Sequence, residues 1–206
     1  MDLSVVRAVL FDMDGTLVDS DAAVERAWHT WAAEFGVDVA AALAIAHGSP
    51  AERTVRRLLP GADEVAVAAA AGRQLALQYD DLFDVTATPG AADLLATLTG
   101  LDLPWAVVTS ADARLAKARL GAAGIDPPVL VTTDDISVGK PDPEGYLRAA
   151  ELVGVAPGRC LVVEDAEVGI QAGRSAGALT AGLKGVDADL RITDLADLAR
   201  RLTAGH

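Results

Sequence analysis

Cysteine, aromatic residues and positive charge are scarce in this sequence. Its one cysteine, Cys160, cannot form an intramolecular disulfide, which is typical of a protein in a reducing cytosol. Aromatic residues make up 4% of the chain although 51% of it is hydrophobic, so Ala, Val and Leu must build the core, as in helices packed on a parallel sheet. Because Cys160 lies in an apolar run, where burial raises the pKa of a thiol, a catalytic thiol is not expected.

Basic residues number 17 against 30 acidic residues, and the net charge is −13. Since no block of basic residues interrupts this negative charge, we expect no nucleic-acid partner. The sequence also lacks an uncharged apolar stretch of about 18 residues and the apolar centre of a signal peptide near its start, so we expect no membrane partner and a cytoplasmic location. A length of 206 residues suits one domain, or one domain that carries a smaller insertion.

An acidic turn follows the first apolar run of the chain. We interpret the run that begins at Ala8 as a short buried strand, and it ends in Asp12, Asp14, Gly15 and Thr16. Residues two apart in a strand point to the same side, so the two carboxylates converge, while the glycine permits a sharp turn and the threonine satisfies backbone groups in it. Two acids so close repel each other unless a cation or a shared proton compensates, which favours a functional site over an ordinary Asp-Gly turn.

The rest of the chain falls into an all-helical block and an alternating block. We expect helices at 22–35, 40–46, 50–59 and 62–82, with Ser49, Pro50 and Glu52 as a capping box at the start of the third. Beyond Pro89, helices alternate with apolar strands, which are expected at 105–108, 129–131, 160–163 and 178–181. This alternation predicts an α/β, Rossmann-like parallel sheet formed by residues 1–17 and 88–206, with an inserted all-helical cap at 18–87.

Polar residues follow three further strands or loops of the alternating block. Thr109 and Ser110 end one strand, Lys140 stands between a glycine and a proline in a loop, and Glu164 and Asp165 end another strand. Open α/β sheets bind ligands at the carboxyl ends of their strands, so these residues are expected near the first acidic turn. Together they supply oxygen ligands for Mg²⁺, a carboxylate nucleophile, and an amine with hydroxyl and amide donors, which are the parts needed for phosphoryl transfer. The competing interpretations are a solvated lysine and an acidic helix cap.

Three glycines, Gly169, Gly173 and Gly177, follow the second acidic pair at intervals of four. We interpret them as small residues that allow close packing of a helix on a strand, and no dinucleotide-binding loop is inferred.

The order of these four motifs resembles the haloacid dehalogenase superfamily. The motifs are Asp-x-Asp-Gly-Thr, the strand-end Thr-Ser, Gly-Lys-Pro and the strand-end Glu-Asp, and the resemblance extends over essentially the whole chain. It is to the phosphatase branch, in which a helical cap is inserted after the first motif. The resemblance implies a sheet order of 3-2-1-4-5, Mg²⁺ as cofactor and an enzyme that works through an aspartyl phosphate.

The resemblance also implies a role for each acid. Asp12 would be the nucleophile that becomes phosphorylated. Asp14 would protonate the leaving oxygen and then activate the water that cleaves the aspartyl phosphate. Asp12, Asp165 and the main-chain carbonyl of Asp14 would hold Mg²⁺, with Glu164 bound directly or through a water.

The remaining motif residues would contact the phosphoryl group or the substrate. The resemblance implies that Thr109 binds phosphoryl oxygens with the Ser110 amide beside it, and that Lys140 pairs with both nucleophile and phosphate. The loop between cap helices faces the core site in this family, so residues of that loop, and Arg53 beyond it, are candidates for substrate contact; a capping or packing role for His47 is an equal alternative. The complete set of expected contacts is Gly15, Thr16, His47, Gly48, Ser49, Thr109, Ser110, Ala111 and Lys140.

Several branches of the superfamily remain to be weighed. Asp14 argues against the dehalogenases of the superfamily, which lack the second acid. The phosphonoacetaldehyde-cleaving branch uses a cap lysine to form a Schiff base, and the absence of lysine between residues 20 and 82 argues against that branch. β-Phosphoglucomutase shares all four motifs, but Val24 stands where that enzyme has a histidine, which favours hydrolysis. A non-enzymatic, phospho-accepting receiver module is a distant alternative, since receivers lack a helical insertion.

The segments Asp19-Ser20, 23–28 and His47-Gly48 are similar to the sugar and polyol phosphatase subgroup, which includes hexitol, 2-deoxyglucose-6-phosphate and glycerol-phosphate phosphatases. We therefore expect a Mg²⁺-dependent phosphomonoester hydrolase of small sugar or polyol phosphates, either a monomer or a weak homodimer.

Overall fold

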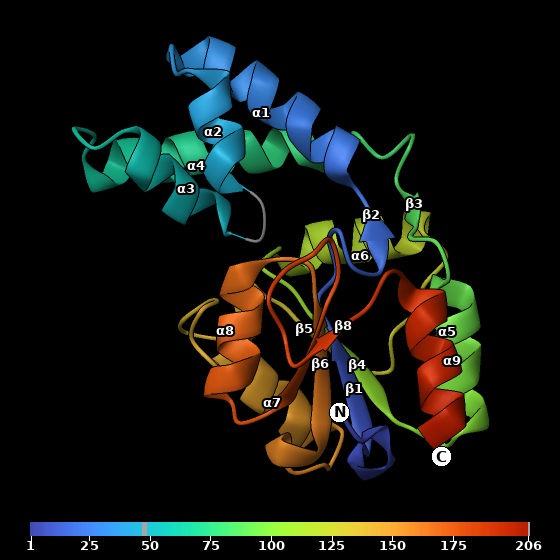
Figure 1. Cartoon of the computed structure of the whole chain (residues 1–206). Coiled ribbons are helices and arrows are strands. Elements are labelled where there is room, and N and C mark those ends of the chain that lie inside the picture. Colours follow the sequence, from blue (N-terminus) through green and yellow to red (C-terminus); the bar gives the residue numbers. More distant parts are fainter. Residues whose placement is uncertain (47–48, 206) are drawn as a thin grey trace.

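The computed structural model describes residues 1–46 and 49–205, and within them a parallel sheet lies between two layers of helices (Figure 1). The six strands of this sheet follow the order β5-β4-β1-β6-β7-β8, and all neighbours are parallel. Numbered along the chain, this is 3-2-1-4-5-6, so the expected α/β Rossmann-like fold is confirmed, with one further strand at the edge. The strands are β1 (Ala8–Phe11), β4 (Trp105–Val108), β5 (Leu130–Val131), β6 (Cys160–Glu164), β7 (Leu179–Gly182) and β8 (Leu190–Arg191).

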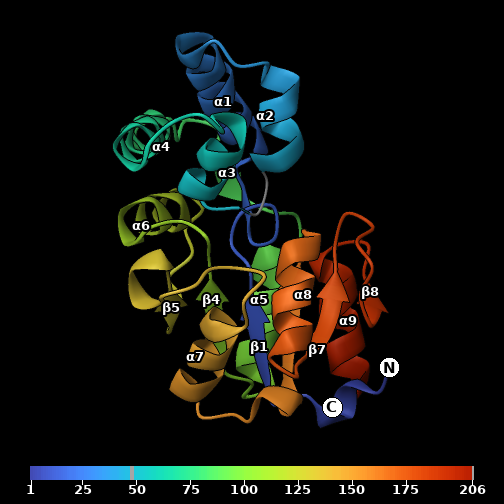
Figure 2. The ribbon, with the colours of Figure 1, turned by 90° about the vertical axis from the view of Figure 1, so that its left-hand side faces the viewer.

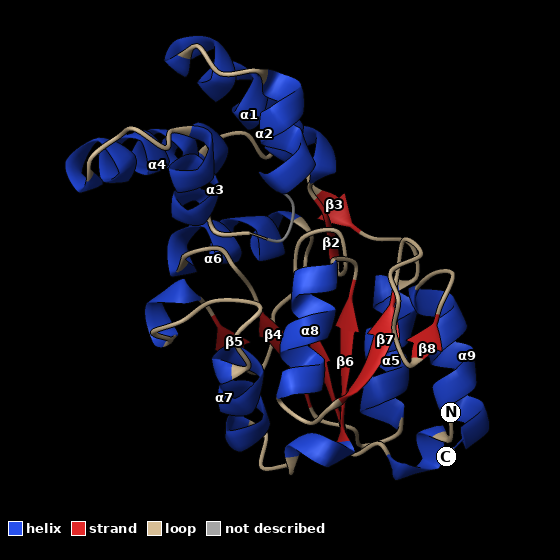
Figure 3. Ribbon diagram, turned by 60° about the vertical axis from the view of Figure 1, so that its left-hand side comes forward, coloured by secondary structure: helices blue, strands red, loops and turns tan. Residues whose placement is uncertain are grey.

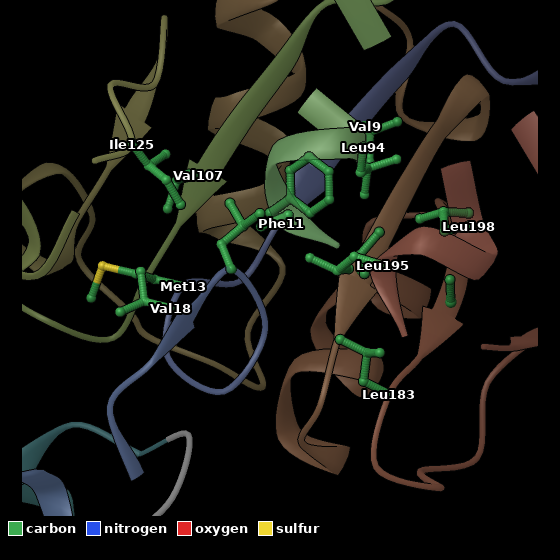
Figure 4. Close-up of a cluster of buried hydrophobic side chains, with 14 of the residues drawn as sticks. Val9, Phe11, Met13, Val18, Leu94, Val107, Ile125, Leu183, Leu195 and Leu198 are labelled. Carbon is green, nitrogen blue, oxygen red and sulfur yellow. The ribbon is translucent and has the colours of Figure 1, made fainter. Parts of the chain in front are cut away.

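The first strand, β1, lies in the middle of the sheet and is buried on both faces. Val9 and Phe11 belong to one apolar cluster and Ala8 and Leu10 to the other, as the period of two along a strand requires. Figure 4 shows Val9 and Phe11 in the first of these clusters. Burial on both faces explains why this strand is a continuous apolar run without polar alternation.

Helices cover the two faces of the sheet. Side chains of α5, α6 and α9 belong to the first apolar cluster, and side chains of α7 and α8 to the second. These helices are α5 (Ala91–Gly100), α6 (Ala113–Ala122), α7 (Glu144–Leu152), α8 (Glu167–Ser175) and α9 (Leu195–Gly205), and short 3-10 helices lie at Leu3–Val5, Thr133–Asp135 and Pro157–Arg159.

Four further helices, here called the cap helices, lie above the carboxyl ends of the sheet strands (Figures 1 and 2). They pack around their own cluster, in which the rings of Trp28 and Trp31 meet edge to face at 5.2 Å. The chain enters and leaves them through β2 (Val18–Asp19) and β3 (Thr86–Ala87), which pair antiparallel. The predicted boundaries of the cap, 18 and 87, stay a prediction. The cap helices are α1 (Asp21–Phe35), α2 (Val39–Ala46), α3 (Ala51–Leu58) and α4 (Glu64–Tyr79).

The predicted capping box at Ser49 is wrong. Helix α3 begins at Ala51 with Pro50 as the N-cap residue, and no side chain caps it. Ser49 precedes the cap position, so its hydroxyl is one residue too early to satisfy the first amides. No helix in residues 1–46 and 49–205 has both the length and the apolar composition needed to cross a bilayer.

Candidate active site

The predicted catalytic residues stand at or near the carboxyl ends of three adjacent strands. Figure 3 shows β4 and β6, the two strands that flank β1 in this sheet. Asp12 follows β1, Thr109 follows β4, and Glu164 and Asp165 stand at the end of β6. Because β4, β1 and β6 are parallel neighbours, their ends lie at one edge of the sheet. Lys140 reaches the same place from the loop before α7. The predicted convergence of these strand ends is therefore present.

Lys140 joins two buried carboxylates. Its Nζ donates hydrogen bonds to Asp12 Oδ1 and, at 2.7 Å, to Glu164 Oε1. It also donates to the main-chain oxygen of Val108 at 3.0 Å, while the Tyr146 hydroxyl donates to Glu164 Oε1 at 2.7 Å. Burial lowers the pKa of Lys140, but Asp12 and then Glu164 raise it by more, so the ammonium group stays charged. With 6% of its side chain exposed, Lys140 is not a solvated surface lysine.

Asp12, Glu164 and Asp165 form a compact acidic cluster in which one carboxylate oxygen of each lies within 4.8 Å of the others. Burial, and after it Glu164, raises the pKa of Asp12 well above its usual value although Lys140 opposes the shift. Burial also raises the pKa of Asp165, against the opposing charge of Lys184 at 3.0 Å. A divalent cation would offset the repulsion among these carboxylates, and three oxygen donors suit a hard ion such as Mg²⁺. The donor set therefore fits the expected cofactor.

Two glycines make room for these acids. Gly15 has a φ of +79°, and a Cβ there would lie 2.1 Å from Oδ2 of Asp165. A Cβ at Gly169, in the first turn of α8, would lie 1.7 Å from Oε1 of Glu164. Gly169 therefore admits a carboxylate, which differs from the predicted role in helix–strand packing. Gly173 has that predicted role, since a Cβ there would lie 3.0 Å from a valine side chain of β6.

The carboxylate of Asp14 is held by two partners that lie on different parts of the chain. The Ser20 hydroxyl donates to Asp14 Oδ1 at 2.6 Å. The guanidinium of Arg119, on α6, lies 2.9 Å from the same oxygen with 3% of its side chain exposed. Arg119 also donates to Oε1 of Gln78 at 2.6 Å, and Nε2 of Gln78 donates to Oε1 of Gln74 at 2.5 Å. Both glutamines lie on the cap helix α4, which packs against α6.

Sequence reasoning missed Arg119, Gln74 and Gln78, although a signal was present for the first. Arg119 shares one face of α6 with the buried Leu115 and Ala116, where a solvated arginine would not be placed. No comparable signal marks the glutamines, because Gln74 bonds to Gln78 on the same helix, and the partner of Gln78 on α6 is 41 residues away in sequence.

A cavity separates the strand ends from the cap helices. Its lining combines the acids of the core, the polar residues of α4 and α6, and apolar side chains of α1 and α4. The cap contributes Val24, Trp28 and Leu75 to the apolar part of the wall. Asp12, Asp14 and Asp165 line this cavity together.

The predicted contact residues are divided between the cavity and its surroundings. Thr109 Oγ1 accepts a hydrogen bond from the amide of Ala111 at 3.1 Å. Thr16 is buried in the turn after Asp14, and its hydroxyl has no hydrogen-bond partner among the described residues. Lys140 is buried and donates a hydrogen bond to Asp12. Of the predicted contact residues that the structure describes, four line the cavity, namely Ser49, Thr109, Ser110 and Ala111.

Two of the contact residues predicted between the cap helices, His47 and Gly48, lie outside the described residues. Arg53, a candidate for substrate contact, instead donates from Nη1 to the main-chain oxygen of Lys140 at 2.8 Å. It links α3 to the loop that carries the lysine.

Comparison with known proteins agrees with this geometry. A family model described as haloacid dehalogenase-like hydrolase matches residues 6–177. Hexitol phosphatase A of Escherichia coli is 43% identical over 83% of this chain and 80% of its own length, and 2-deoxyglucose-6-phosphate phosphatase 1 of Saccharomyces cerevisiae is 36% identical over 84% and 78%. The crystal structure of a β-phosphoglucomutase from Clostridium difficile superposes with a TM-score of 0.86 at 20% identity, over 97% of this chain and 98% of that one, which shows a shared fold.

The superfamily resemblance and the expectation of an enzyme are thereby confirmed. With a family model matched over most of its length and a relative 43% identical to it, the chain belongs to the haloacid dehalogenase-like hydrolases.

Proposed function

We propose that this phosphatase hydrolyses monophosphate esters of small sugars or polyols, with Mg²⁺ as cofactor and a phosphorylated Asp12 as intermediate. The observation that carries the proposal is the buried Asp12, which pairs with Lys140 and belongs to an acidic cluster at the cavity. The similarity to a hexitol phosphatase and a 2-deoxyglucose-6-phosphate phosphatase supports the substrate class. In this proposal residues 18–87 act as a cap over a core of residues 1–17 and 88–206.

The hydrogen bonds around Asp12 suit it to be the nucleophile. Lys140 holds Oδ1 and leaves Oδ2 to attack the phosphorus, while the ester oxygen departs on the opposite side. The ammonium group offsets charge on the transferring phosphoryl group, together with the Thr109 hydroxyl and the Ser110 amide.

Asp14 is suited to move the protons. It first gives a proton to the departing oxygen, and it then takes one from the water that attacks the phosphorus of the intermediate. The second step releases inorganic phosphate and restores the carboxylate of Asp12. Ser20 and Arg119 both contact Oδ1 of Asp14, which fixes the position of its side chain for both transfers.

Mg²⁺ would be held by Asp12, Asp165 and the main-chain carbonyl of Asp14, with Glu164 bound directly or through a water. When bound, it supplies positive charge against the phosphoryl oxygens. Oε1 of Glu164 already accepts hydrogen bonds from Lys140 and Tyr146, so this residue also orients the lysine.

The mutase alternative is less favoured. Val24 lines the cavity where a mutase of this family has a histidine, and an apolar side chain there cannot restrain the general acid by a hydrogen bond. Likeness to the mutase at 20% identity supports a common fold alone, whereas the relatives above 30% identity named here are phosphatases.

The test measures phosphate release from hexitol and hexose monophosphates, with Mg²⁺ and with EDTA. The wild type should release phosphate only with Mg²⁺, and Asp12→Asn should lose more than a thousandfold in kcat, because an amide cannot form the intermediate. Asp126→Asn, at an exposed loop position, is the matched control and should keep the wild-type rate.

Two results would contradict the proposal. Hydrolysis by Asp12→Asn at the wild-type rate would exclude Asp12 as the nucleophile. Conversion of β-glucose 1-phosphate to glucose 6-phosphate, primed by a bisphosphate and with little phosphate released, would favour the mutase.

A further inference from the structure

A chain of buried polar side chains runs from the catalytic end of the cavity into the cap. It begins at Asp14, continues through Arg119 of α6 and Gln78 of α4, and ends at Gln74, one turn earlier on α4. All three residues beyond Asp14 are buried, with Arg119 and Gln74 at 2% and 0% exposure, and all line the cavity. Nε2 of Gln74 has no hydrogen-bond partner among the described residues.

The chemistry of Arg119 fixes the direction of every hydrogen bond in this chain. A guanidinium group only donates, so Gln78 must turn its carbonyl oxygen toward Arg119. The amide NH₂ of Gln78 then faces Gln74, which must accept with its own oxygen. The NH₂ of Gln74 is therefore the free end of the chain, and it cannot be exchanged with the oxygen without losing a hydrogen bond.

A buried donor without a partner is costly unless a ligand in the cavity accepts a hydrogen bond from it. Nε2 of Gln74, the free end of this row of side chains, is therefore expected to donate to an oxygen atom of a ligand bound in the cavity. Val24, Trp28 and Leu75 form an apolar wall of the same cavity, which suits the carbon face of a small ligand.

The charges around the chain indicate which kind of oxygen fits. The charge of Arg119 is matched by Asp14 at 2.9 Å, although its Nε, like Nε2 of Gln74, has no hydrogen-bond partner among the described residues. The glutamine in the cavity lining is neutral. A carboxylate on the ligand would meet no uncompensated cation at this place and would add to the acids Asp12, Asp14 and Asp165. A hydroxyl group accepts the hydrogen bond without that repulsion.

We propose that Gln74, oriented by Gln78 and Arg119, donates a hydrogen bond to a hydroxyl oxygen on the leaving group of the substrate. The enzyme therefore selects neutral polyhydroxy leaving groups over apolar or carboxylated ones. The proposal rests on the proposed function, and it assigns the selectivity to this buried chain. Gln74 is the contact residue, and Gln78 and Arg119 are positioning residues.

The experiment compares two substrates in each variant. The first is the hexitol or hexose phosphate that the wild type hydrolyses with the highest kcat/KM, and the second is phenyl phosphate, which has no hydroxyl on its leaving group. In Gln74→Leu the ratio of the two kcat/KM values, sugar over phenyl, should fall about tenfold. Gln171→Leu, an exposed glutamine on α8, is the matched control and should keep the wild-type ratio.

The orientation of Gln74 gives a second readout. In Gln78→Leu the amide of Gln74 loses the partner that fixes it and can turn, so the ratio should fall by nearly as much as in Gln74→Leu. The double variant should show no further loss, because residues that act as one unit are not additive. Thermal unfolding of each variant and its rate with phenyl phosphate report whether the protein is folded.

The outcomes separate the inference from the function on which it rests. A wild type that releases no phosphate from any of these substrates would overturn the proposed function. A wild type that is active, with a ratio unchanged within twofold in Gln74→Leu or with fully additive losses in the double variant, would overturn the role of the buried chain alone. Preference of the wild type for a carboxylated phosphate such as 2-phosphoglycolate would also overturn it.

Discussion

Replacing Lys140 with methionine removes the ammonium group that two buried carboxylates share. Asp12 and Glu164 are 5% and 1% exposed, and both accept hydrogen bonds from the lysine. Methionine fills a similar length without charge, so the two acids would face each other without their cation. Breaking a buried ion pair by removing one partner costs about 3–5 kcal/mol, and we expect a loss of that size in the free energy of unfolding at neutral pH.

The loss should depend on pH in a definite direction. Burial, Glu164 and Asp165 already raise the folded-state pKa of Asp12 above 3.8, and Lys140 opposes them. Without Lys140 that pKa rises further. A carboxyl with a raised folded-state pKa adds stability below its unfolded pKa and loses it as the pH rises through the folded value. The difference between wild type and variant should therefore be smallest near pH 4 and grow toward pH 8.

Urea unfolding in EDTA between these pH values measures this difference. Lys117→Met, an exposed lysine on α6, is the matched control and should change stability by less than about 0.5 kcal/mol. A loss below about 1 kcal/mol in Lys140→Met, or one that is constant with pH, would refute this account of the ion pair.

Two further predictions concern packing around the same sheet. Gly169→Ala should displace Glu164 and lower both stability and activity, because the added Cβ would lie 1.7 Å from Oε1 of Glu164. Gly72→Ala, in an open part of α4, should instead stabilise the protein by about 0.5–1 kcal/mol. Denaturant unfolding of both variants checks this prediction, and equal effects on stability would contradict it. Cys160 is buried and burial raises its pKa to about 11, so a thiol reagent at pH 8 should modify it only after unfolding; labelling of the native protein within minutes would count against that burial.

The strand-end residues were predictable because a parallel sheet converts sequence position into spatial position. Asp12, Thr109 and Glu164 each follow an apolar run that is too short and too continuous for a helix, so the edge where they lie follows from the topology. The two-residue strands β2, β3 and β8 were not predicted, because each contains a polar residue and none lies in an apolar run, whereas β5, which is equally short, lies in the apolar run 129–131.

The parts of the site that the sequence hides depend on contacts between distant segments. Arg119 pairs with Asp14 and Gln78, and nothing local to α6 specifies either partner. Gly169 was assigned to packing because its spacing from Gly173 is helical, but the space it leaves is filled by Glu164. Periodicity identifies the buried face of a helix, and it does not identify which neighbour lies against that face.

Among the described residues, three hydrogen bonds join the cap helices α3 and α4 to the core, and two of them lead to Asp12 and Asp14. Arg53 holds the main chain of Lys140, whose amine holds Asp12, and Arg119 holds both Asp14 and α4.

The third contact strengthens the same connection. The Tyr79 hydroxyl of α4 donates to Asp112, the N-cap residue of α6, at 2.5 Å, and this hydrogen bond raises the pKa of Tyr79 to about 12, so the hydroxyl remains a donor over the working pH range. A displacement of α3 or α4 would therefore break hydrogen bonds one residue removed from Asp12 and from Asp14. Because both carboxylates are connected to the cap helices in this way, the positions of these two acids and the shape of the cavity between them and the cap helices cannot change independently.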